Sequence, residues 1–103
     1  MAYKVSRLDV ADYLTDENTI AEYLSSVLAE GNTALLISAI GDVAKARGMS
    51  HIAELAGLGR ESLYKALSPD SKPRFETIVK VLNALGITIQ LTSIKDNVPE
   101  QAA

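Results

Sequence analysis

A run of polar side chains between residues 60 and 65 is the part of this sequence with the most readily defined chemistry. Arginine can donate two hydrogen bonds to the edge of guanine, serine can donate to a base or a phosphate, and glutamate can accept from cytosine. In a helix, Leu63 would point inward and leave the polar residues on the outer face. We interpret this face as a surface for reading the major groove of double-stranded DNA; its residues are Arg60, Glu61, Ser62, Tyr64 and Lys65.

Three residues outside this run are suited to holding the phosphate backbone. Lys72 and Arg74 are cations in and just after a polar loop, and contacts of this kind set register without reading sequence. Ser50 opens a predicted helix, where its hydroxyl and the helix N-terminus would meet a phosphate. The alternative interpretation of all these residues is an ordinary solvated surface, in which Glu61 pairs with Arg60 instead of a base.

The sequence lacks the residue combinations of common catalytic and metal sites. It contains no Cys and a single His, so thiolate ligands and disulfides are excluded. His51 and Glu54 lie three residues apart but have no third ligand. Asp9 and Asp12 are better explained as carboxylates that stabilise the start of a helix than as an acid–base pair. We therefore expect no enzymatic activity, no metal site and no cofactor.

Two short helices, predicted over residues 50–56 and 60–67, would position the polar run. Gly57 can adopt the left-handed conformation that a tight turn requires. Ala53 is small enough to let the two helices approach closely. The apolar residues predicted to join the helices are Ile52, Ala56, Leu58, Leu63, Ala66 and Leu67.

The remaining sequence predicts further helices over residues 9–14, 16–30, 33–47 and 74–85, from their apolar spacing and capping residues. Residues 87–92 alternate strictly and are β-branched, which predicts a half-buried strand. The expected fold class is mainly α, a bundle of about five helices with a short C-terminal β-strand. A strand needs a partner, which is either Tyr3–Leu8 of the same chain or the equivalent strand of a second chain. The candidate helix caps are Thr15, Asn32 or Thr33, and Ser50.

Charge is distributed unevenly along the 103 residues, whose formal net charge is −3 at pH 7. Residues 1–30 carry six acidic and two basic side chains, whereas residues 44–80 carry seven basic and four acidic ones. We expect an acidic N-terminal segment, residues 1–31, packed on a DNA-binding domain over residues 32–94, followed by a flexible tail over residues 95–103. No signal peptide or membrane-spanning run is apparent, which predicts a cytoplasmic protein without a membrane partner.

The stretch from Ser50 to Leu67 resembles the lambda-repressor-like (Xre-type) helix-turn-helix. Ala53, Gly57 and Leu58 match its first helix and turn, and Leu63 matches the buried position of its recognition helix. Over residues 9–91 the chain more narrowly resembles the probable addiction-module antidote proteins, which are HigA-like antitoxins. The runs that carry this resemblance are Asp9–Leu14, Ala46–Ala53, Gly59–Ser68 and Leu82–Ile87.

The resemblance implies the antitoxin of a type II toxin–antitoxin module, a homodimer that represses its own operator and neutralises a RelE/ParE-like toxin by direct binding. Such a toxin is often a basic ribonuclease, and the acidic N-terminal segment is the surface that we expect it to contact. The alternative is a stand-alone Xre-type transcriptional regulator without a toxin partner. The residues expected to bind a toxin are Tyr13, Asp16, Glu17, Glu22 and Tyr23.

Overall fold

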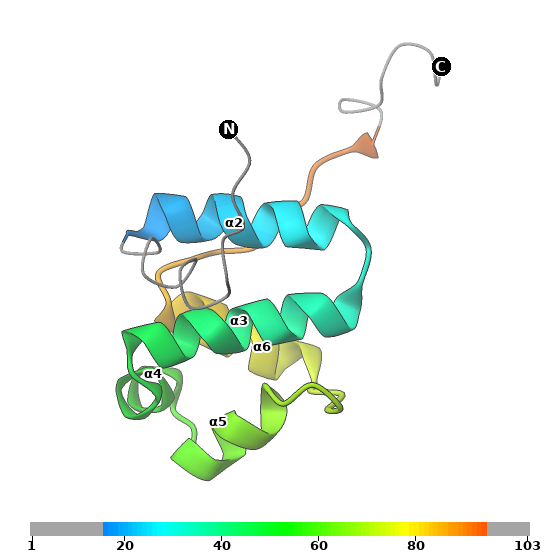
Figure 1. The fold of residues 1–103 in the computed structure, drawn as a ribbon. Helices are drawn as coiled ribbons and strands as arrows, with labels where there is room; N and C mark the ends of the chain where they lie inside the picture. The colour runs from blue at the N-terminus through cyan, green and yellow to red at the C-terminus, as the bar shows by residue number, and fades with distance from the viewer. Residues whose placement is uncertain (1–15, 95–103) are drawn as a thin grey trace, which may run out of the picture.

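The computed structural model describes residues 16–94. Within them the chain forms five helices, which follow the numbering of Figure 1. They are α2 (Glu17–Ala29), α3 (Thr33–Arg47), α4 (Met49–Ala56), α5 (Arg60–Ala66) and α6 (Phe75–Ala84). The mainly α fold class is therefore confirmed. The helix predicted over residues 9–14 and the segment Tyr3–Leu8 lie outside the described residues.

The helices are arranged so that α2 and α5 occupy opposite sides of the domain (Figure 1). α2 packs against α3, and α4 contacts α3, α5 and α6. α3 thus lies between α2 on one side and the α4–α5 pair on the other (Figure 1). Among residues 16–94, no helix has both the length and the apolar character needed to span a lipid bilayer.

Two of the helix starts follow directly from local sequence. At α3 the side chain of Asn32 accepts a hydrogen bond from the backbone N–H of Leu35 at 3.0 Å, as predicted for one of the two candidate caps. At α2 the cap is Asp16, not the predicted Thr15, and its Oδ1 accepts from the Thr19 N–H at 2.8 Å. Gly31 has a φ of +77°, a left-handed conformation that ends α2 where the sequence predicts.

A single core joins the helices, with contributions from each of them. The largest fully buried side chains are Ile20, Ile40, Val43, Ile52, Leu63, Val81 and Leu85. Two large apolar residues that fit the apolar spacing of their helices are nevertheless exposed: Leu28 is 62% exposed and Phe75 is 71% exposed. Leu28 lies in the last turn of α2 and Phe75 begins α6, so both are at helix ends, beyond the part that neighbouring helices cover.

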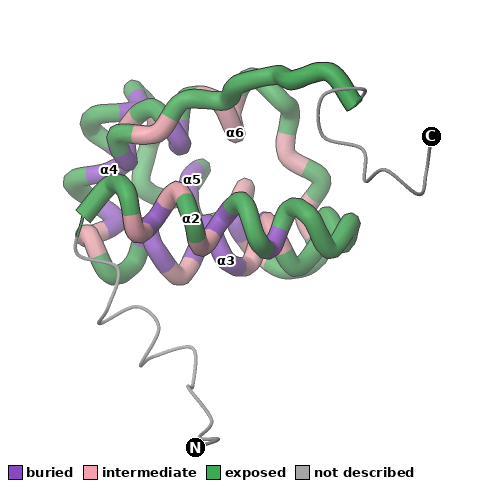
Figure 2. The backbone as a smooth tube through the Cα atoms, turned by 90° about the horizontal axis from the view of Figure 1, so that it is seen from above, coloured by how far each residue is buried: buried purple, intermediate pink, exposed green. Residues whose placement is uncertain are grey.

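The structure corrects the predicted half-buried strand over residues 87–92, because no residue among 16–94 is in a strand. A strand forms only where two segments exchange backbone hydrogen bonds, and no described segment pairs with residues 87–92 in this way. Ile87 is half-buried, Ile89 is 42% exposed and Leu91 is 91% exposed, so the alternating face is not covered. Figure 2 shows the segment after α6 running exposed along the outside of the domain.

Candidate nucleic-acid interface

The candidate site is built on α4 and α5 and the tight turn between them. Gly57 ends α4 with φ 71° and ψ 32°, so the predicted left-handed conformation is confirmed. The backbone N–H of Leu58 donates to the carbonyl of Ala53 at 2.9 Å, which holds the turn against α4. Gly59 is extended and precedes the first residue of α5, Arg60. Two short helices therefore follow one another with three residues between them.

α5 is fixed to the domain by its inner face. Leu63 is fully buried, as predicted, and Leu67 is buried directly after the helix. Gly41 of α3 lies close to this end of α5, since a methyl group added at Gly41 would lie 3.3 Å from the carbonyl oxygen of Leu67. Sequence reasoning did not identify this close approach, although a glycine in the middle of a predicted helix was a signal for it.

The outer face of α5 is polar and accessible. Arg60 and Tyr64 lie one helical turn apart, and the guanidinium carbon of Arg60 is 5.5 Å from the centroid of the Tyr64 ring. This distance is within the range of a cation–π interaction. The five residues predicted to face outward are all exposed: Arg60, Glu61, Ser62, Tyr64 and Lys65.

The three predicted phosphate contacts occupy different surroundings. Ser50 is exposed in the first turn of α4 but does not cap it, because the helix begins at Met49 after Gly48 and has no side-chain cap. Lys72 is exposed in the loop that follows α5. Arg74 precedes α6 and forms an exposed ion pair with Glu76 at 3.6 Å. All three side chains are therefore exposed at the surface, where a nucleic acid could contact them.

The residues predicted to bind a protein partner lie on α2, at the opposite side of the domain. Asp16, Glu17 and Glu22 are exposed, whereas Tyr23 is half-buried against the core. Tyr13 lies outside the described residues. Hydrogen bonds from the backbone and side chain of Thr19 hold the pKa of Asp16 below its ordinary value.

Glu17 also contacts residues of two other segments of the chain. Its Oε2 lies 4.0 Å from Nη2 of Arg47 at the end of α3. Its Cγ would be only 2.7 Å from a methyl group added at Gly86, which follows α6. The start of α2 therefore packs against the ends of α3 and α6, a set of contacts between distant segments that sequence reasoning did not find.

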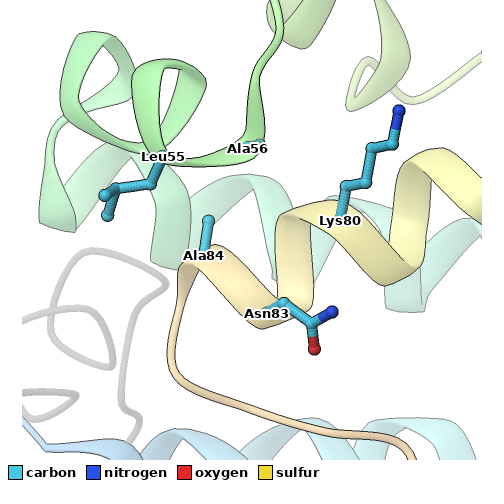
Figure 3. Close-up of a pocket in the computed structure, with 5 residues that line it drawn as sticks. All are labelled: Leu55, Ala56, Lys80, Asn83 and Ala84. Atoms are coloured by element: carbon cyan, nitrogen blue, oxygen red, sulfur yellow. The ribbon is translucent and has the colours of Figure 1, made fainter.

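An open pocket of about 320 Å³ lies between α4 and α6 (Figure 3). Leu55 and Ala56 line it from α4, and Lys80, Asn83 and Ala84 line it from α6. Lys80 is the one ionisable side chain in its lining, so the pocket contains no acid–base pair. No group of three His, Asp or Glu side chains among residues 16–94 is arranged to hold a metal ion, and His51 and Glu54 are both exposed on α4.

Residues 16–94 form a compact domain of five helices, and comparison with known proteins assigns the family of the chain. Residues 4–93 match the family described as "Probable addiction module antidote protein". The chain belongs to this family, in agreement with the resemblance seen in the sequence. Antidote proteins of this kind are typically non-enzymatic, and the family implies a toxin as partner.

One relative has been matched at high identity. It is an uncharacterized protein of Haemophilus influenzae (strain ATCC 51907 / DSM 11121 / KW20 / Rd), 47% identical over 91 residues, which cover 88% of this chain and 94% of the relative. No solved structure gives a significant match.

Proposed function

We propose that this protein is the antitoxin of a type II toxin–antitoxin module. It binds its own operator DNA as a transcriptional autorepressor and neutralises a RelE/ParE-like toxin by direct contact. The observation that carries this proposal is the separation of two chemically different surfaces. α5, which carries the exposed polar residues, and α2, which carries the exposed carboxylates, lie on opposite sides of α3 (Figure 1), so one molecule can hold both partners at once.

The DNA-binding part of the proposal treats α4 and α5 as a lambda-repressor-like helix-turn-helix. In such a motif the second helix enters the major groove with its N-terminal residues against the bases. Here the buried Leu63 fixes α5 to the core and the exposed polar residues project from it. Lys72 and Arg74 follow α5 in sequence and are exposed, which suits contacts to phosphates beside the groove. Ser50 at the start of α4 is suited to the same role.

The toxin-binding part rests on charge and exposure along α2. Residues 16–30 contain four carboxylates and no lysine or arginine, so this surface attracts a basic partner and speeds association. Affinity additionally needs exposed apolar contacts. Val27 is buried and Tyr23 is half-buried, whereas Leu28 is 62% exposed. Leu28 is therefore the better apolar anchor on this helix.

Dimerisation is the third part of the proposal, because one helix-turn-helix reads few base pairs. Two copies would present their α5 helices about 34 Å apart, one turn of DNA. Residues 74–92 are the surface that we propose to join them. Within this range Phe75 and Leu91 are highly exposed, and removing such apolar side chains from water against a second copy would favour association.

DNA binding is tested by gel shift on the region upstream of the protein's own gene. Arg60→Ala and Ser62→Ala are each expected to weaken specific binding by about 1–3 kcal/mol and to relax sequence preference. Lys72→Ala is expected to weaken binding to all sequences. It should also reduce the slope of the logarithm of the binding constant against the logarithm of the salt concentration by about one. Unchanged affinity in both α5 variants would remove this face from the DNA site.

Toxin binding is tested by stopped-flow association at low salt with a RelE/ParE-like protein encoded beside this gene; a neighbourhood without such a gene would favour the stand-alone regulator. Replacing Asp16, Glu17 and Glu22 by Ser should slow association, while Ser at position 16 retains a capping hydroxyl. The matched control replaces three exposed carboxylates elsewhere, Glu54, Asp70 and Glu76, and so makes the same change in net charge. Equal rates in the two triple variants would refute α2 as the docking surface. Absence of any binding would favour the stand-alone regulator.

A further inference from the structure

We infer that Tyr64 is a positioning residue that holds the guanidinium of Arg60 ready to read a guanine, so that this pair sets one base of the operator half-site. The inference rests on the proposed DNA-binding function and names how its specificity arises. It begins from the one interaction within α5 that joins two outward-facing side chains, the 5.5 Å approach of the Arg60 guanidinium to the Tyr64 ring.

The spacing of the two residues explains why they meet. Side chains four positions apart on a helix lie on the same face, whereas adjacent side chains do not. Tyr64 is four residues after Arg60, while Glu61 is its immediate neighbour. Among residues 16–94, Arg60 forms no ion pair with Glu61 or any other carboxylate. The structure thus favours the aromatic ring over Glu61 as the group that orients Arg60.

Stacking on a ring differs from an ion pair in what it leaves available. A guanidinium donates hydrogen bonds in its own plane, and its electrostatic attraction to the face of a ring does not require an oxygen acceptor at those donors. Bidentate contact with O6 and N7 of guanine needs these in-plane donors, and it needs them in a fixed orientation. A carboxylate partner would compete for the same donors, whereas Tyr64 restrains the Arg60 side chain and leaves its N–H groups available to the guanine.

The energetic role of Tyr64 is therefore to reduce the freedom that Arg60 loses on binding. An arginine side chain has substantial rotamer entropy, which an interaction present before binding partly removes. An exposed cation–π contact of about 0.5–1 kcal/mol corresponds to about a two- to fivefold effect on affinity. The effect should appear for the base that Arg60 reads and not for non-specific DNA.

The test is a quantitative competition assay in which each base pair of the operator is changed in turn. The parent protein should prefer guanine at one half-site position by about 5- to 150-fold, and Arg60→Ala should remove that preference. Tyr64→Leu, which lacks the ring, should reduce the preference by about two- to fivefold at the same position. Tyr64→Phe retains the ring and should stay within about twofold of the parent.

A second measurement examines the stack without DNA. In the parent and in Tyr64→Phe, ring current should shift the NMR signals of the Arg60 methylene protons upfield, and Tyr64→Leu should remove the shift. Because Tyr64 is 41% exposed, these variants are expected to keep the fold, which circular dichroism checks.

The outcomes separate this inference from the function on which it rests. A Tyr64→Leu variant with an undiminished guanine preference, or a Tyr64→Phe variant as impaired as Tyr64→Leu, would overturn the positioning role while DNA binding stands. Effects of Arg60→Ala and Tyr64→Leu at different base pairs would overturn it as well. A parent protein that binds no operator sequence would overturn the proposed function itself.

Discussion

The turn between α4 and α5 offers a prediction whose size follows from the local geometry. Gly57 has a φ of +71°, and a methyl group added to it would meet no atom within 4 Å. A substitution there is therefore opposed by backbone conformation and not by steric contact of its Cβ. L-residues in the left-handed region cost about 1–2 kcal/mol, and a β-branched residue is expected to cost more.

We expect Gly57→Val to lower the free energy of unfolding by about 1–3 kcal/mol. For a domain of this size each kcal/mol lowers the melting temperature by about 4–8 °C. Gly57→Ala should have a smaller effect, and Gly57→Asn the smallest of the three, because asparagine tolerates this conformation. Thermal unfolding followed by circular dichroism gives the order of the variants.

A matched control comes from Gly31, in the loop between α2 and α3. Gly31 has a φ of +77° and, like Gly57, has nothing within 4 Å of an added methyl group. If backbone conformation alone sets the cost, Gly31→Ala and Gly57→Ala should be destabilised by similar amounts. A Gly57→Val variant with the same melting temperature as the parent would refute the left-handed turn. A much larger cost at Gly57 than at Gly31 would show that packing, not conformation, dominates.

Four further predictions follow from other positions. Ile20 is fully buried, so Ile20→Ala should lower the free energy of unfolding by about 2–5 kcal/mol, with unfolding still in one cooperative transition. A variant in which α2 unfolds in a separate transition would contradict a shared core. Asp16→Ala should lower the melting temperature at neutral pH. Hydrogen bonds lower the folded pKa of Asp16 from 3.8. The difference in melting temperature between the parent and Asp16→Ala should therefore be present above pH 3.8 and vanish as the pH falls through the folded pKa. A difference that does not change with pH would exclude the charged cap. Gly59→Ser should add a missing side-chain cap to α5 and stabilise the protein by a few tenths of a kcal/mol, about 1–3 °C; an unchanged melt would indicate that the hydroxyl cannot reach the free N–H groups. Finally, Phe75→Ser should weaken self-association in sedimentation runs if residues 74–92 join two copies, while Leu55→Ser on α4 should not, although Leu55 is also an exposed apolar residue (58%, against 71% for Phe75); equal behaviour of the two variants would count against this surface.

Local sequence was sufficient to predict much of the fold and the face of the candidate site. Asn32 caps α3, Gly57 forms the left-handed turn, and Leu63 is buried while its neighbours are exposed, all as predicted. These features depend on interactions within a few residues: a side chain bonding to an N–H three positions on, a glycine tolerating positive φ, or the helical period. Such interactions can be read from spacing alone.

Other predictions failed or were never made, because they depend on which segments meet. Leu28 and Phe75 fit the apolar spacing of their helices but are exposed, since no neighbouring helix covers those ends. Residues 87–92 alternate like a strand, yet alternation does not supply a pairing partner among the described residues.

Interactions within a few residues were enough to predict the helices among residues 16–94, the turn before α5 and the polar residues on the outer face of α5. Three further features are visible only in the folded chain: α2 lies across α3 from α5, Gly41 approaches Leu67, and Glu17 packs against Gly86. These are contacts between residues far apart in the chain, and their partners are selected by the shape of the whole core.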